Sequence, residues 1–347
     1  MLLKINNLSK HHNGEKPMKT KTLLAAALCA SLFASGASFA DDDVTLRFSN
    51  ATNVAAKDAA VPMMEVANKD SDGTITIKHF PDNMLGDDRV ATESTIMGDI
   101  DIVLTQPSVL TAFVPDAYAW EAPFLFNNAE EGIKCFNSEL ASKINNQVEK
   151  KGLKVLAMVG NGFRNYTNNK VAVKVPNDVK GQKVRVMETD IQMAMWQAWG
   201  ANPTPMAFAE LLPALQQGTV DAQENPVAII DANKLYEVQH YISLTGHLYS
   251  PQILLMNKAK YDSLSEKQQK AIDNAVAAFV KKQRERSIEL DNLSIDKFKQ
   301  AGCEVIELTD ADRKLWQQDA IDGGVYDLIK SKMEHPEYLD QIINKQY

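Results

Sequence analysis

The chain has 347 residues, of which 45% are hydrophobic, 24% charged and 7% aromatic. This composition is that of a globular protein, and it excludes a disordered, collagen-like or disulfide-rich chain. The formal charge of −8 at pH 7 excludes binding to nucleic acid or to an anionic membrane through a broad basic surface. Because a single hydrophobic core stops growing near ~250 to 300 residues, the length predicts about two domains with a cleft between them.

Residues 1–40 are predicted to be an upstream extension followed by a cleaved export signal. Two lysines precede the short apolar run of residues 23–33, and small residues end the segment. We expect translation to start at Met18 and the mature chain to start at Asp41. A membrane anchor is excluded because the apolar run is too short to cross ~30 Å of hydrocarbon. The mature chain, which has 32 basic and 44 acidic residues, is expected to be exported without membrane insertion.

After the signal, the sequence predicts an α/β unit with a parallel sheet covered by helices on both faces. Alternating apolar residues predict strands, and apolar residues at helical spacing predict the helices between them. The expected strands are residues 44–49, 74–79 and 100–104, with helices near residues 59–67 and 87–97.

A second α/β unit is expected in the middle of the chain. The expected elements are a helix over residues 129–150, strands over residues 153–159, 171–175 and 184–186, and a helix over residues 191–199. Residues 161–164 are expected to leave the end of the first of these strands. Since no glycine-serine linker is present, we expect strands to cross directly from one unit to the other.

Residues 265–301 are predicted to form one long helix. Ser265 and Gln268 make a capping box, and apolar residues at helical spacing follow until a glycine stop. An unbroken helix would measure roughly 55 Å at ~1.5 Å per residue, whereas a lobe of about 150 residues is only about 40 Å across. Such a helix must lie across both lobes. The alternative is two helices with a kink near Arg286 or Asn292.

Signatures of catalysis and of metal binding are missing from the sequence. It contains no nucleophile elbow, phosphate-binding loop, His-Glu-x-x-His or Cys-x-x-Cys motif, and the histidines lack the spacing of metal ligands. No metal, cofactor or catalytic residue is predicted, and a binding protein is preferred to an enzyme. Cys135 and Cys303 are the cysteines of the mature chain, and they fit either a disulfide or two free thiols.

Four residues stand out as candidates for a ligand site. Arg185 lies in a short apolar strand, so its charge requires either a structural ion pair or a cleft that binds an anion. The same alternatives hold for Arg164, because ligands of open α/β sheets bind where strands end. Phe208 fits a ligand contact or the core. Asn225, held extended before a proline, fits a ligand contact or a turn.

Several motifs together carry a resemblance to a known family. They are DVKGQKVRV at residues 178–186, PMAFAE at residues 205–210 and VDAQENP at residues 220–226, with LGDDR at residues 85–89 and NGFR at residues 161–164. Their order and spacing resemble the periplasmic solute receptors of tripartite ATP-independent periplasmic (TRAP) transporters, of the C4-dicarboxylate-binding (DctP) type. The resemblance covers nearly all of the mature chain. It implies a two-lobed α/β fold of the periplasmic binding protein kind, with a cleft, a hinge and a long helix spanning both lobes.

The resemblance also implies roles for particular residues. In such receptors the arginine at the position of Arg185 holds the ligand carboxylate, and Arg164 adds a second positive contact. Phe208 packs on the ligand and Asn225 hydrogen-bonds it. Two further positions, Gln106 and Glu188, fall where members vary with their ligand.

The lobes and partners follow from the same resemblance. We expect one lobe from residues 41–162 with about 251–290, and the other from residues 163–250 with about 291–347. The expected partners are a small carboxylate ligand and the small and large membrane subunits of a TRAP permease. A sensor in place of the permease, and a periplasmic enzyme using Glu188 or Glu224 as a base on a small organic acid, are the alternative functions.

Glu188 bears on the kind of acid that is bound. An ionised Glu188 would repel a second ligand carboxylate but would accept hydrogen bonds from ligand hydroxyls. We therefore expect a hydroxylated acid such as a uronate in preference to a C4-dicarboxylate such as succinate. If Glu188 instead points into solvent or pairs with a lysine, this argument falls away.

Overall fold

The computed structural model of the protein describes residues 42–51 and 53–347. The predicted signal segment, with its start at Met18 and its cleavage before Asp41, lies outside the described residues. Among the helices of the described part, none is long and apolar enough to cross a membrane.

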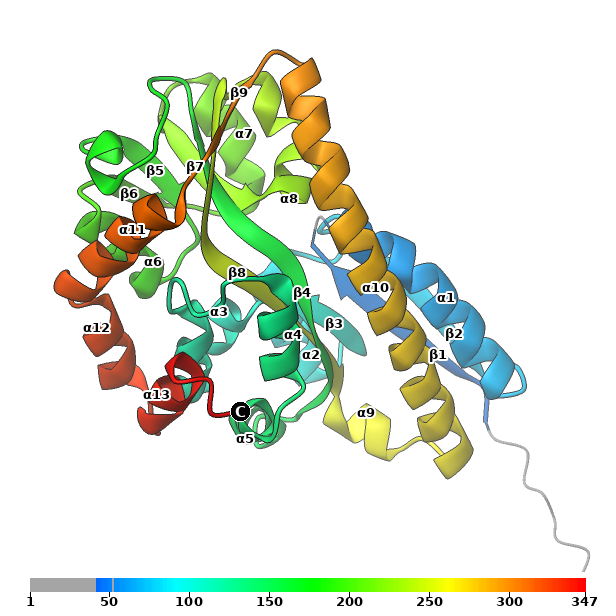
Figure 1. The fold of residues 1–347 in the computed structure, drawn as a ribbon. Helices are drawn as coiled ribbons and strands as arrows, with labels where there is room; N and C mark the ends of the chain where they lie inside the picture. Colours follow the sequence, from blue (N-terminus) through cyan, green and yellow to red (C-terminus); the bar gives the residue numbers. More distant parts are fainter. Residues whose placement is uncertain (1–41, 52) are drawn as a thin grey trace, which may run out of the picture. The chain divides into compact units, whose positions relative to one another are not determined.

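In the described part of the chain, nine strands form one mixed sheet in the order β2-β1-β3-β8-β4-β7-β5-β6, with β9 beside β8 (Figure 1). The first half of the sheet is parallel and consists of β1 (Val44–Asn50), β2 (Ile75–Phe80) and β3 (Ile102–Thr105). The second half has a parallel set of β5 (Lys183–Val186), β6 (Asn202–Pro205) and β7 (Ala222–Pro226). Both predicted α/β units are therefore present.

Two long antiparallel strands join the halves of the sheet. β4 (Leu153–Asn168) and β8 (Tyr241–Asn257) pair along their length, while β8 pairs with β3 at one end and β4 pairs with β7 at the other. This arrangement confirms that strands cross directly between the units. The prediction that the strand ends before residues 161–164 is wrong, because β4 continues through them. An irregularity between Gly160 and Phe163, with Gly162 at φ +86°, lets the strand bend there.

Two other local predictions are corrected by the structure. The helix predicted over residues 129–150 is two helices, α4 (Ala129–Phe136) and α5 (Glu139–Glu149), because the Ser138 hydroxyl caps α5 by accepting from the backbone N–H of Ala141. No strand forms at residues 171–175. There, the Asn168 side chain accepts from the backbone N–H groups of Lys170 and Val171 and turns the chain away from the sheet.

The long helix is unbroken, as predicted, and α10 runs over Glu266–Gln300. The Ser265–Gln268 capping box is present at its start. Near that end, Phe279 and its apolar neighbours pack in the core of the first half of the sheet, and near the other end Phe298 packs in a core of the second half. α10 therefore spans both halves, and the kinked alternative is wrong (Figure 1).

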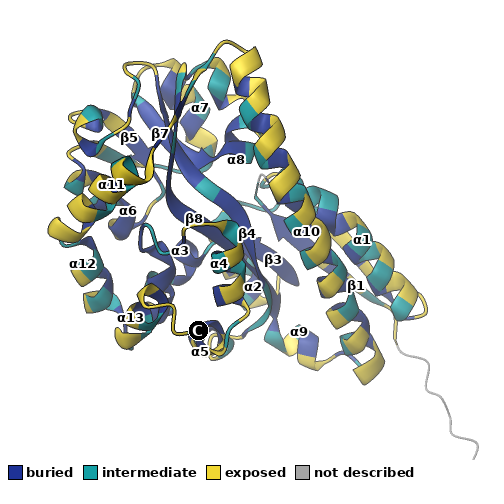
Figure 2. Cartoon of the chain, viewed as in Figure 1, coloured by how far each residue is buried: buried dark blue, intermediate teal, exposed yellow. Residues whose placement is uncertain are grey.

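The remaining elements cover the faces of the sheet, with buried inner and exposed outer surfaces (Figure 2). They are α1 (Val54–Asp70), α2 (Asp88–Met97), α3 (Pro107–Leu110), η1 (Pro115–Glu121), η2 (Pro176–Val179), α6 (Asp190–Ala198), α7 (Phe208–Gln216), α8 (Val227–Ala232), η3 (Leu235–Glu237), α9 (Lys258–Asp262), α11 (Asp310–Asp322), α12 (Val325–Lys332) and α13 (Glu337–Ile343). The ninth strand, β9 (Glu304–Glu307), belongs to the sheet itself and pairs with β8. Cys135 and Cys303 are free thiols, which decides between the two alternatives left open by the sequence.

Candidate ligand-binding site

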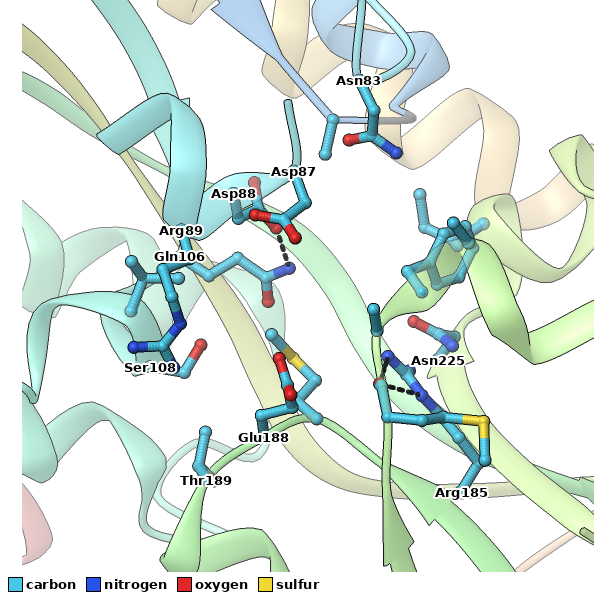
Figure 3. A pocket seen from close by; sticks show the side chains of 18 of the residues that line it. Asn83, Asp87, Asp88, Arg89, Gln106, Ser108, Arg185, Glu188, Thr189 and Asn225 are labelled. Carbon is cyan, nitrogen blue, oxygen red and sulfur yellow. Dashed lines mark hydrogen bonds between the residues drawn. The ribbon is translucent and has the colours of Figure 1, made fainter. Parts of the chain in front are cut away.

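A cavity of about 310 Å³ is lined by residues from both halves of the sheet (Figure 3). The first half contributes loops and helix starts that follow β2 and β3, and the second half contributes those that follow β5, β6 and β7. All six residues predicted from the sequence line this cavity: Arg164, Arg185, Phe208, Asn225, Gln106 and Glu188. That these side chains bind a ligand remains a prediction.

Arg185 is a buried cation of the cavity that has no carboxylate partner among the described residues. It lies on β5 between β6 and β7 and is only 3% exposed. Its Nε and Nη2 donate to the backbone carbonyl of Met206, at 3.2 and 2.8 Å, and within the described residues it forms no ion pair with a carboxylate. Burial lowers the pKa of Arg185 to about 10, so it stays charged at neutral pH. Arg185 therefore faces the cavity instead of a structural ion pair, and its binding of an anion stays a prediction.

Arg164 belongs to a buried network that its own half of the molecule completes. Its Nε and Nη2 donate to the two carboxylate oxygens of Glu224, at 2.5 and 2.6 Å. His247 Nε2 lies 3.0 Å from one of the same oxygens, and His247 Nδ1 lies 2.8 Å from the Thr245 hydroxyl. Of the two alternatives for Arg164, a structural ion pair or a cleft that binds an anion, the structure shows the ion pair. The Arg164 side chain also forms part of the cavity wall.

The ionisation of this network follows from its geometry. Burial raises the pKa of Glu224, but Arg164 and the hydrogen bond from His247 outweigh it and bring the pKa down to about 2. Burial lowers the pKa of His247, so a neutral imidazole donates from Nε2 to Glu224 and accepts from Thr245 at Nδ1. A carboxylate held ionised in this way is a weak base, which counts against Glu224 as a catalytic residue.

Phe208 and Asn225 flank Arg185 in the cavity. Phe208 is the first residue of α7, and its ring centre lies 5.7 Å from the Arg185 guanidinium carbon, within reach of a cation–π contact. Asn225, near the end of β7, donates to Gln223 at 2.6 Å and accepts from Arg164 at 3.2 Å. These bonds fix the orientation of the Asn225 amide, whose second N–H has no hydrogen-bond partner among the described residues.

The side of the cavity away from Arg185 is rich in carboxylates (Figure 3). Gln106 donates to Asp88 at 3.3 Å, and Asp87 and the exposed Glu188 line the same cavity. Burial raises the pKa of Asp88 to about 6, even though the Gln106 hydrogen bond lowers it. The sequence analysis missed Asp88 as a site residue, although it lies inside the LGDDR motif. Arg89 is the cation on this side.

An α/β fold in two halves, with a polar cavity between them built around a free arginine, is the architecture of an extracellular solute-binding protein. Residues 48–322 match the family described as bacterial extracellular solute-binding protein, family 7, DctP. The chain belongs to this family, so the predicted fold class and the predicted kinship with TRAP receptors are confirmed. Among the described residues, no group of His, Cys, Asp and Glu side chains could hold a metal ion.

Three similar proteins are named for a sugar acid or solved with one bound. The 2,3-diketo-L-gulonate-binding periplasmic protein YiaO of Escherichia coli is 34% identical over 312 residues, which cover 90% of this chain and 94% of that protein. A sugar acid binding protein of Advenella mimigardefordensis, solved with galactonate, has a TM-score of 0.83 at 29% identity, over 88% of this chain and 98% of that one. A TRAP periplasmic solute-binding protein from Sulfitobacter, with bound β-D-galacturonate, has a TM-score of 0.82 at 27% identity, over 87% of this chain and all of the other (100%).

Proposed function

We propose that this solute receptor binds a small hydroxylated monocarboxylate, such as a uronate or aldonate, and delivers it to the two membrane subunits of a TRAP permease. Delivery and the periplasmic location rest on the family. Glu224, one of the two bases considered for the enzyme alternative, is locked in its ion pair with Arg164, which favours binding over catalysis by that residue. The alternative partner is a sensor protein that the receptor would serve instead of a permease.

The observation that carries the proposal is the state of Arg185. A buried guanidinium bound only to a backbone carbonyl has an unbalanced charge, because a carbonyl dipole compensates it less than a carboxylate does. A ligand carboxylate would complete the pair through a planar two-pronged contact. The low dielectric of a buried site strengthens this attraction, so a protein with a net negative charge still binds an anion locally.

The opposite side of the cavity favours hydroxyl groups over a second carboxylate. Asp87, Asp88 and Glu188 outnumber Arg89 among the charged residues there, and their excess negative charge would repel a second carboxylate. Carboxylate and amide oxygens accept hydrogen bonds from sugar hydroxyls. The sugar acids named for the similar proteins agree with this preference.

Calorimetry with a panel of acids tests the proposal. D-Glucuronate, D-galacturonate, D-gluconate, D-galactonate, malate and succinate would be titrated into the wild-type protein and into Arg185→Lys. Lysine keeps the charge but loses the planar fork, so we expect binding to weaken by roughly 30- to 1000-fold, or about 2 to 4 kcal/mol. Lys183→Arg, an exposed position on the same strand, is the control and should bind as the wild type does.

Different outcomes would overturn different parts of the proposal. If succinate binds more tightly than every hydroxylated acid, the ligand class is wrong. If Arg185→Lys binds the panel as tightly as the wild type, Arg185 is not the carboxylate site. Conversion of any of these acids into a product, followed by NMR, would support the enzyme alternative.

We further propose that the ligand closes two lobes, residues 41–162 with about 251–290 and residues 163–250 with about 291–347. The bend of β4 near Gly162 lies where the strands cross between the halves, which is where a hinge would absorb the change in backbone angles. Small-angle scattering should give a smaller radius of gyration with a saturating ligand. Identical curves with and without ligand would contradict closure.

A further inference from the structure

The last three helices of the chain run along one flank of the molecule, from the second half of the sheet to the first. α11 contacts α6 and β8, α12 contacts both α6 and η1, and α13 contacts η1. Figure 1 shows these helices on the side of the sheet away from α10. This flank therefore carries a connection between the halves in addition to β4, β8 and α10.

The start of this segment is anchored on the second half of the sheet through Trp316 of α11. The Trp316 side chain is fully buried, and its Nε1 donates to the Lys174 carbonyl at 2.8 Å. Its own carbonyl accepts from Trp199 Nε1 at 2.9 Å, at the end of α6. Both indole rings lie in contact, with centroids 4.9 Å apart.

The end of the segment is anchored at the fully buried carboxylate of Asp116 in η1. The backbone N–H of His335 donates to one oxygen of Asp116 at 2.8 Å, and His335 Nδ1 lies 2.6 Å from the other. Gln147 of α5 donates to that second oxygen at 2.5 Å. Lys345 pairs with Glu131 of α4 at 2.9 Å, so the chain is held to the first half both before and after α13.

We propose that residues 333–347 are a strap that ties the half carrying η1, α4 and α5 to the half carrying α6 and α11, and that this strap limits how far the ligand cavity opens. Only residues 333–336 separate α12 from α13, and four residues span at most ~14 Å when fully extended. The connection therefore has little slack. If the halves separate on this flank, α12 must leave α6 or η1, and the strap must either detach at Asp116 or hold the halves back.

This proposal rests on one part of the proposed function, namely that the two halves of the molecule open and close around the ligand cavity. A double variant, His335→Ala with Lys345→Gln, removes the ring contact to Asp116 and the ion pair to Glu131. Lys258→Gln is the matched control, because Lys258 forms an exposed ion pair with Asp262 on α9, outside the strap. Hydrogen exchange of residues 337–347 and small-angle scattering of the ligand-free and ligand-bound protein are the measurements.

In the double variant we expect faster exchange of residues 337–347 and a larger radius of gyration without ligand, but an unchanged radius with saturating ligand. Because a smaller fraction of the protein is then ready to close, we also expect the dissociation constant of the tightest sugar acid to rise about 3- to 10-fold.

The control variant should match the wild type in exchange, radius of gyration and affinity. Unchanged exchange would mean that these contacts do not hold the strap, and faster exchange with an unchanged ligand-free radius would mean that the strap does not limit opening. Either result overturns the proposal, and neither depends on whether the wild type binds sugar acids.

Discussion

The guanidinium of Arg164 and the carboxylate of Glu224 form a buried two-pronged ion pair at the wall of the ligand cavity, with oxygen–nitrogen distances of 2.5 and 2.6 Å. Among the described residues, Arg185 in the same cavity donates hydrogen bonds to the Met206 carbonyl and has no carboxylate partner. The two arginines therefore differ in their partners, although both line the cavity. Glu224 neutralises the charge of Arg164, and no such partner balances the charge of Arg185.

Glu224→Gln is expected to destabilise the protein by about 3 to 5 kcal/mol at pH 7, because the substitution leaves the Arg164 charge buried and unpaired. Urea denaturation would measure this loss. Since the pKa of Glu224 is depressed to about 2, its contribution in the wild type is present above about pH 4.5 and is lost as the pH falls through about 2. Glu139→Gln, which breaks an exposed pair with Lys143, should cost under about 1 kcal/mol. Equal losses for the two variants would contradict the prediction.

Asp291→Asn is expected to stabilise the protein at alkaline pH. Asp291 lies on α10 against Gly162, one of its oxygens has no hydrogen-bond partner in the described structure, and burial raises its pKa to about 7. Wild-type stability should therefore fall as the pH rises from about 3.8, where the unfolded group ionises, through about 7. Thermal denaturation should show a higher midpoint for the variant at pH 8 and no difference near pH 4. Asp296→Asn, an exposed position on the same helix, serves as the control, and an equal midpoint for Asp291→Asn and the wild type at pH 8 would refute the idea.

His335 should contribute stability at acidic pH and not at alkaline pH. The hydrogen bond to Asp116 raises the pKa of His335, so its contribution is fully present below about pH 6.5 and disappears as the pH rises through the raised pKa. His335→Gln should therefore lower the melting temperature at pH 5.5 and leave it almost unchanged at pH 8.5. His240→Gln, another exposed histidine, should not show this pattern. A loss of the same size at both pH values would mean that charge is not involved.

Glu188→Gln should shift selectivity towards dicarboxylates. Removing a charge about 4 Å from a second carboxylate in water relieves ~1 kcal/mol, so the affinity for succinate relative to a sugar acid should improve about fivefold. Asp88→Asn should act in the same direction. Glu210→Gln, which is exposed and lies outside the cavity lining, is the control. Calorimetry that gives the same succinate-to-uronate ratio for Glu188→Gln and the wild type would exclude this role for Glu188.

Local features of the fold were predictable from the sequence because they depend on neighbouring residues. The capping box at Ser265 and the apolar spacing that follows it predicted the whole of α10. The break between α4 and α5 was missed because apolar spacing continues across the Ser138 cap. β8 was not predicted at all, since its buried residues form no alternating pattern and its pairing partners lie far away in the chain.

The candidate site was predictable only in part. The motifs brought Arg185, Phe208 and Asn225 to attention, and the structure gathers them around one cavity. The partners of Arg164 were not foreseen, because Glu224 is 60 residues away and His247 a further 23. The pairing of β4 with β7 and β8 brings those charges together. Such long-range pairing cannot be predicted from the spacing of residues in the sequence.

The length of α10 is constrained by its two anchors. One inserted residue would turn the downstream half of the helix by about 100° and advance it by ~1.5 Å. Phe298 would then leave the core of the second half while Phe279 stayed in the first. This helix can therefore change in composition over evolutionary time, but a single-residue insertion or deletion between the anchors would separate the two cores that it connects.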